Sequence, residues 1–187
     1  MLANKKYITE LQLSSNGMFA EGAIALGQSL KDKKYLEVFS IKKNEIGLQG
    51  IRALEECFNL SRTIKELNLS GNNFGDEGIE IVIKALSSKK RQSLNNLCLS
   101  NNRITSVGCK MVCEFIKKCH SLEELHISNN DIDNAGANEL IKVLKDKDNF
   151  SNIDIDNNKI SGETLTSLFN ILPLRNLNLL KNTLTDE

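Results

Sequence analysis

Two short segments carry the side chains with the clearest potential for chemistry. Glu124 and His126 stand two residues apart, and Asp154 and Asp156 repeat this spacing further along the chain. A spacing of two places both side chains of a pair on one face of a β-strand. Carboxylates and an imidazole on neighbouring strands could bind a metal ion or exchange protons. They could equally attract a basic surface of a partner protein.

We interpret these four residues as part of a protein-binding patch, and we expect no metal ion and no cofactor. The cluster has no fourth ligand at a typical metal-site spacing. No nucleophile–base pair or phosphate-binding glycine loop stands out elsewhere in the sequence, so we expect no enzymatic activity. Ordinary scatter of surface charge is the competing explanation for the patch.

The basic side chains divide between one strand end and several loops. Lys42 and Lys43 are adjacent and predict a basic spot on the same face as the acidic residues. Lys89, Lys90 and Arg91 lie in a lysine-rich loop that could contact an acidic partner or phosphate, although a solvated loop is the simpler interpretation. The net charge of zero argues against a nucleic-acid partner.

An asparagine recurs at nearly constant intervals and reveals an internal repeat. These residues are Asn16, Asn44, Asn72, Asn102, Asn130, Asn158 and Asn182. The intervals are 28, 28, 30, 28, 28 and 24 residues. We therefore predict a single domain, 1–187, with repeats that start near residues 8, 36, 64, 94, 122, 150 and 174, the last one degenerate or truncated.

The residues before each asparagine follow the frame L-x-x-L-x-L-x-x-N-x-I. The third copy reads Ile64, Leu67, Leu69, Asn72 and Phe74. Alternation of this kind predicts a strand with one buried face. Each asparagine can turn its amide inward to bond backbone groups at the following bend, which predicts an asparagine ladder through the stack.

After each asparagine the apolar period becomes helical. Apolar pairs stand ten and fourteen residues later, as Leu26/Leu30, Leu54/Phe58, Val82/Leu86, Val112/Ile116, Leu140/Leu144 and Leu168/Leu172. This spacing predicts an amphipathic helix in each repeat. N-cap residues are expected three positions after the asparagine, at Gly47, Gly75, Thr105, Asp133 and Ser161. Glycines six positions after it are expected to let the helix approach its neighbours, at Gly22, Gly50, Gly78, Gly108 and Gly136.

Each repeat is therefore a strand, a turn, a helix and a turn. The predicted fold is an α/β open right-handed solenoid of about seven repeats, with parallel strands on the concave face and helices on the convex face. From Ile8 to the C-terminus these motifs resemble the ribonuclease-inhibitor-like leucine-rich-repeat family, whose units run to about 28 residues. The resemblance implies a horseshoe used for protein recognition, and some members bind GTPases or nucleases.

The side chains between the leucines should form the concave face. Asn68 and Asn96 lie there beside the basic spot and the acidic patch, and Cys98 is expected to be exposed between them. The face has no Trp, Tyr or Phe, which are the usual interface anchors. A solvated sheet without a partner is therefore the alternative to a binding surface.

The cysteines are five in number and irregularly spaced, as expected of reduced thiols. Cys109 and Cys113 lie one helical turn apart and are predicted to be buried. Cys119 and His120 match no zinc-finger spacing. The N-terminus has no apolar segment of a secretory signal, and no apolar run is long enough to span a bilayer. We expect a cytoplasmic protein with no membrane, nucleic-acid or small-molecule partner.

Three functional hypotheses follow. The first is a non-enzymatic protein-binding module, compatible with a receptor, a scaffold or a secreted effector that acts in a host-cell cytosol. The second is a GTPase-activating protein similar to Ran-type activators, with Arg103 and Asn101 or Asn129 as candidate residues. The third is a structural unit that assembles through its end strands. Repeat six gains Pro173 and repeat seven stops after Leu184, so the end is either a makeshift cap or part of a longer chain.

Overall fold

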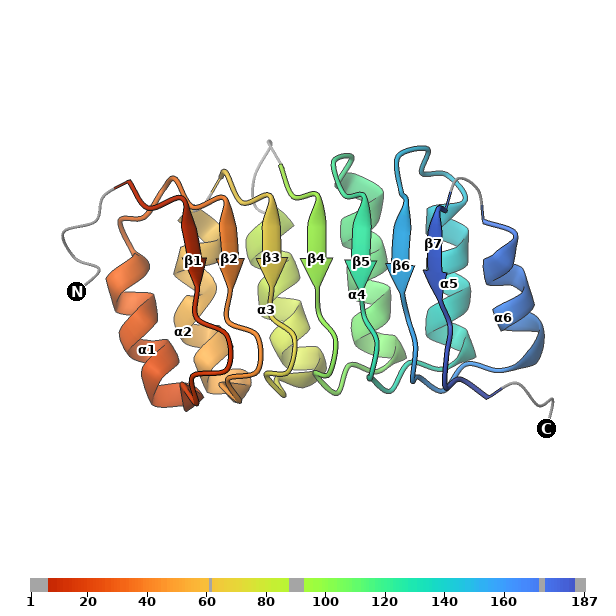
Figure 1. The fold of residues 1–187 in the computed structure, drawn as a ribbon, viewed down its shortest axis with the longest axis horizontal. Coiled ribbons are helices and arrows are strands. Elements are labelled where there is room, and N and C mark those ends of the chain that lie inside the picture. Colours follow the sequence, from red (N-terminus) through yellow and green to blue (C-terminus); the bar gives the residue numbers. More distant parts are fainter. Residues whose placement is uncertain (1–6, 61, 88–92, 172–173, 184–187) are drawn as a thin grey trace.

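The computed structural model describes residues 7–60, 62–87, 93–171 and 174–183. Within them, strands and helices alternate along the chain and form two layers (Figure 1). The strands lie side by side in one parallel sheet whose order follows the sequence, and the helices cover one side of it. The predicted α/β solenoid of about seven repeats is confirmed.

Each strand is three residues long and pairs in register with the next. The strands are β1 (Glu10–Gln12), β2 (Val38–Ser40), β3 (Glu66–Asn68), β4 (Asn96–Cys98), β5 (Glu124–His126), β6 (Asn152–Asp154) and β7 (Asn176–Asn178). The middle residue of each points inward, and Leu67, Leu97 and Leu125 pair directly across neighbouring strands. All three are at most 1% exposed. Inward leucines of successive repeats therefore form one continuous stack.

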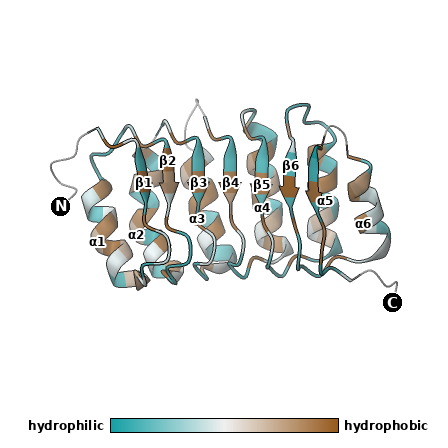
Figure 2. Ribbon diagram, in the orientation of Figure 1, coloured by the Kyte–Doolittle hydropathy of each residue, from teal (hydrophilic) through white to brown (hydrophobic). Residues whose placement is uncertain are grey.

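The helices bury the apolar faces that the sequence predicted. They are α1 (Phe19–Leu30), α2 (Gly47–Leu60), α3 (Gly75–Ser87), α4 (Ser106–Lys118), α5 (Asn134–Leu144) and α6 (Gly162–Phe169). Apolar and polar positions alternate around each helix (Figure 2). Among the predicted apolar pairs, Leu86 is half-buried and Leu172 lies outside the described residues, while the other members are buried. No described helix is long and apolar enough to cross a membrane.

The repeating asparagines join neighbouring coils to each other. The Asn72 amide nitrogen donates to the carbonyl oxygens of Leu69, at 2.9 Å, and of Ile41 in the preceding repeat, at 3.0 Å. Its side-chain oxygen accepts from the backbone N–H of Asn44 at 3.2 Å. Asn102 repeats this pattern one coil further. The amides therefore satisfy buried backbone groups of two repeats at once.

A left-handed backbone conformation recurs at the residue before each asparagine. These residues are Ser15, Lys43, Gly71, Asn101, Asn129, Asn157 and Lys181, with φ between 48° and 71°. Asparagine and glycine tolerate this conformation better than most residues do. The frequent Asn at this position therefore has a backbone reason and does not by itself indicate a binding function.

Helix capping follows the prediction only in part. Thr105, Asp133 and Ser161 are the N-cap residues of their helices, as predicted. Thr105 and Asp133 accept hydrogen bonds from the first turns of their helices, whereas the Ser161 side chain makes no such bond. Helices α2 and α3 begin at Gly47 and Gly75 themselves, and both glycines have a left-handed φ. A glycine there supplies the required turn rather than a capping side chain.

A second set of caps comes from the neighbouring repeat. Asp76 of α3 accepts from the backbone N–H groups of Thr105 and Gly108 and from the Thr105 hydroxyl, at 2.9, 3.1 and 2.6 Å. Ser106 does the same for the next coil, accepting from the N–H groups of Asp133 and Gly136. These side chains accept hydrogen bonds from backbone N–H groups that have no partner within their own helix, and they fix the spacing of adjacent helices.

The helix glycines follow the prediction in part. A Cβ on Gly78 would overlap Phe74 of its own repeat, whereas at Gly108 and Gly136 the nearest atoms belong to Asp76 and Ser106 of the preceding helix. Another close approach between helices occurs at Gly27. A Cβ there would collide with the backbone carbonyl of Ala53 in α2, which has no flexible group to move aside.

Gly27→Ala is therefore expected to lower the free energy of unfolding by about 1–2 kcal/mol, because overpacking against backbone outweighs the gain in helix propensity. The matched control is Gly22→Ala in the same helix, where the new Cβ meets the half-buried Met18 side chain. Urea denaturation measures both variants. Equal stability of the two would contradict the proposed backbone contact.

Candidate functional site

The sheet face, meaning the side of the sheet away from the helices, holds the predicted site residues. Strands β3 to β6 place Asn68, Asn96, Glu124, His126 and Asp154 on this face, each at an outward position that flanks a buried one. All five are half-buried. Register pairing sets His126 directly beside Asp154 on the neighbouring strand.

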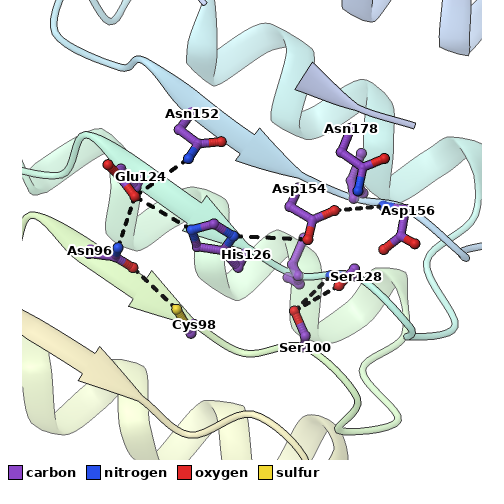
Figure 3. Close-up of polar contacts among 12 residues, drawn as sticks. Asn96, Cys98, Ser100, Glu124, His126, Ser128, Asn152, Asp154, Asp156 and Asn178 are labelled. Carbon is purple, nitrogen blue, oxygen red and sulfur yellow. Dashed lines mark hydrogen bonds and ion pairs between the residues drawn. The ribbon is translucent and has the colours of Figure 1, made fainter. Parts of the chain in front are cut away.

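The side chains of β4, β5 and β6 form a continuous polar network (Figure 3). Asn96 Nδ2 donates to Glu124 Oε2 at 2.9 Å, and Asn152 Nδ2 donates to the same oxygen at 3.5 Å. His126 lies between two carboxylates, with Nε2 3.5 Å from Glu124 Oε2 and Nδ1 3.9 Å from Asp154 Oδ2. A protonated His126 would pair with both acids, whereas a neutral imidazole leaves the patch with its full negative charge.

Asp156 extends the acidic patch beyond the end of β6. Its backbone N–H donates to Asp154 Oδ1 at 3.4 Å. Burial raises the pKa of Asp156, and the neighbouring Asp154 charge raises it further. The charge of Asp154 therefore disfavours the ionised form of Asp156, and a cation placed beside them would relieve this repulsion.

Cys98 lies at the centre of the face and is not a nucleophile. It is half-buried rather than exposed as predicted, and its Sγ donates to Asn96 Oδ1 at 3.2 Å. Burial raises the pKa of this thiol to about 11, with a further contribution from Glu124. A thiol with this pKa stays protonated at neutral pH and reacts slowly. Cys109 and Cys113 are buried in α4 as predicted.

A shallow depression brings the basic spot and the acidic patch together. Its volume is about 400 Å³, and its lining includes Lys42, Lys43, His126 and Asp154. The sequence suggested two separate charged spots, because Lys42 and Asp154 are far apart along the chain. Ser70 and Ser128 also line it, and they are only 7% and 5% exposed, although their positions predicted outward side chains. The smaller depression beside it, about 180 Å³, is lined in part by Asn96.

The described residues named for the GTPase-activating hypothesis lie at different places on the surface. Arg103 is exposed in the turn after β4 and has a left-handed φ of 59°, outside the residues that line the depression. Asn101 and Asn129 line the depression. In the described part of the chain no group of three or more His, Cys, Asp or Glu side chains could hold a metal ion. The Lys89–Arg91 segment lies outside the described residues, as do Pro173 and Leu184.

Comparison with solved structures supports the fold. Internalin C2 of Listeria monocytogenes superposes with a TM-score of 0.58 at 20% identity, covering 96% of this chain and 74% of that one. The tropomodulin C-terminal domain of Caenorhabditis elegans gives 0.53 at 14% identity, covering 91% and 86%. The actin-binding site 2 of leiomodin-1 gives 0.50 at 16%, covering 91% and 82%. Identities this low show a shared fold and nothing further.

Sequence comparison identifies the family of the repeats. No curated protein matches the chain. A family model described as Leucine Rich repeats (2 copies) matches residues 92–139, and one described as Leucine Rich repeat matches residues 4–27 and 60–80. The similarity to the ribonuclease-inhibitor-like subtype stays a prediction. With the matched segments, the stacked coils and the asparagine ladder in agreement, the chain is a leucine-rich-repeat protein.

Proposed function

We propose that this protein is a non-enzymatic module that binds a partner protein on its sheet face. The observation that carries the proposal is the network of polar contacts that joins Asn96, Glu124, His126 and Asp154 on three neighbouring strands. Side chains held on a rigid sheet lose little entropy when a partner binds, which favours recognition. One fold neighbour is named for an actin-binding site, an example of this fold in a protein-binding role.

The chemistry of the face favours a partner with a basic surface. The charge of Asp154 raises the free energy of the ionised form of Asp156, so a lysine or arginine from the partner would gain more here than at an isolated carboxylate. The net charge of zero gives no general attraction for polyanions, which is why we propose a protein rather than a nucleic acid.

We place this activity in the cytoplasm. None of the five cysteines forms a disulfide, and all but Cys98 are buried. Reduced thiols of this kind are typical of proteins in a reducing compartment. The wider setting, whether receptor, scaffold or effector, depends on the identity of the partner.

The test is a pull-down in which the acidic patch is neutralised without a change of side-chain size. Glu124→Gln, Asp154→Asn and Asp156→Asn are combined in one variant, and captured proteins are quantified by mass spectrometry. We expect the variant to lose at least about tenfold of the partner captured by the wild type, since such a loss needs only about 1.4 kcal/mol.

The control variant changes three exposed acids on the helices. Glu56→Gln, Glu80→Gln and Glu114→Gln remove the same charge from the opposite side of the molecule, where surface ion pairs contribute little to stability. We expect this control to capture the partner at the wild-type level. Equal capture by the acidic-patch variant would exclude the patch as the binding surface.

A further inference from the structure

The depression on the sheet face has opposite charges at its two sides. Lys42 and Lys43 follow β2, while Asp154 belongs to β6. Four strand intervals separate β2 from β6, so at about 4.8 Å per interval these charges stand ~19 Å apart. The depression therefore crosses the strands, with a basic end at repeat two and an acidic end at repeats five and six.

Small side chains line the depression between these two ends and leave open space there. Ser70, Ser100 and Ser128 lie at equivalent positions in consecutive repeats and line the depression together with Gly71. Ser100 and Ser128 are joined by a hydrogen bond of 2.9 Å between their hydroxyls (Figure 3). In the same row, the charged residues Lys42 and Asp156 flank these serines on either side. The floor is thus polar, low and uncharged.

Both charged ends act on the middle of the depression. Cys98 lines it, and the pKa of this thiol is lowered by Lys42 and raised by Glu124 and Asp154 in addition to the effect of burial. The opposite influences of the two ends thus meet at β4. A ligand lying along the depression would therefore experience a field that changes sign along its length.

The length and volume of the depression fit an extended chain. A volume of about 400 Å³ spread over ~19 Å corresponds to a cross-section about 5 Å wide, close to the spacing of one β-strand. An α-helix with side chains needs about 10–12 Å. At about 3.3 Å per residue, an extended chain covers the distance with about six residues.

We propose that the depression binds an extended segment of the partner protein that carries an acidic side chain for Lys42 and Lys43 and, about six residues away, a basic side chain for Asp154. This inference rests on the proposed function and specifies the chemistry of the partner. The charge order fixes the direction of the segment across the strands, because a reversed segment would place like charges together at both ends.

The probe for this proposal is a synthetic peptide of about ten residues with two aspartates near one end and two arginines near the other, centred about six residues apart and joined by serine and glycine. A second peptide of the same composition has its charges interleaved. Binding is measured by fluorescence anisotropy at low salt, where charge contacts are least screened. We expect the bipolar peptide to bind at least about fivefold more tightly.

Protein variants test each end separately. Lys42→Glu with Lys43→Glu should lower the affinity for the bipolar peptide by about tenfold, and Asp154→Asn should lower it by about threefold. Lys42→Glu alone provides a milder variant, and circular dichroism checks that each one is folded. The matched control, Lys84→Glu with Lys110→Glu, changes two exposed lysines on α3 and α4 and should leave the affinity unchanged.

Three outcomes would overturn the proposal. They are equal affinity for the two peptides, an affinity insensitive to either end, and no binding of the bipolar peptide up to about 1 mM. The pull-down above distinguishes these failures from failure of the proposed function. If the partner is lost when the acidic patch is neutralised but fully retained by Lys42→Glu with Lys43→Glu, the sheet face remains a binding surface. The proposal of a bipolar segment is then excluded. If neither variant changes the capture of the partner, both the proposed function and the bipolar segment are excluded.

Discussion

Replacing Asn102 with alanine is expected to lower the free energy of unfolding by about 3–5 kcal/mol, because it leaves several buried backbone groups without partners. Its side-chain oxygen accepts from the N–H groups of Asn72 and Asn73, both at 2.9 Å. Its amide nitrogen donates to the carbonyls of Leu69 and Leu99, both at 3.0 Å. Asn102 itself is 0% exposed, so water cannot replace these bonds without opening the structure.

The control for this prediction is Asn16→Ala at the first repeat. Asn16 is exposed, and its amide nitrogen donates to the carbonyl of Ser14 at 3.2 Å. Its replacement should change stability by no more than about 0.5 kcal/mol, as for other surface substitutions. Urea denaturation followed by circular dichroism measures both variants. A similar small effect at Asn102 and Asn16 would show that the ladder does not stabilise the stack.

The sequence predicts the repeat architecture because the same residue pattern recurs independently in each repeat. Leu67, Leu97 and Leu125 occupy the same place in three frames, and the structure pairs them in register. One copy of such a pattern is weak evidence, but several copies in phase determine where each strand and helix lies. Fold prediction here depended on periodicity, which is a property of the chain alone.

Contacts between repeats were harder to predict, because they depend on how two coils are placed together. Asp76 caps the helix that follows it by a full repeat, whereas the local pattern indicated only caps from within each repeat. A polar acceptor four residues after the ladder asparagine, as at Asp76, Ser106 and Asn134, is the signal that could have revealed it. The same reasoning accounts for Gly27, whose importance appears only when α2 is placed against it.

In the candidate site, too, some features follow from the local sequence and others depend on how the repeats pack together. The outward position of Glu124, His126 and Asp154 follows from strand alternation alone. Burial of Ser70 and Ser128 in the depression does not follow, since it depends on the side chains of neighbouring repeats. A charge pattern that spans four strand intervals has no counterpart in any local stretch of sequence. Such surfaces therefore become visible only when equivalent positions are compared across coils.

Leu97→Ala should produce a loss of similar size, about 3–5 kcal/mol, for a different reason. Leu97 is the middle residue of β4 and is 0% exposed. It is enclosed by Leu67 on one side and Leu125 on the other. Truncation to alanine would leave a cavity that the rigid neighbouring strands cannot close. In such surroundings the loss in free energy of unfolding lies at the upper end of the usual range for a buried leucine.

The matched variant is Leu177→Ala in β7, the last strand that the structure describes. Leu177 has the same place in its repeat and pairs with Ile153 on one side, but it is only half-buried. Part of its apolar surface is already in contact with water, so we expect a loss of no more than about 1–2 kcal/mol. Urea denaturation with the two variants in parallel measures the difference. Equal losses would mean that stability is not carried by contacts between neighbouring coils, whereas a larger loss at Leu97 is expected if each inward leucine completes the layer of the next repeat.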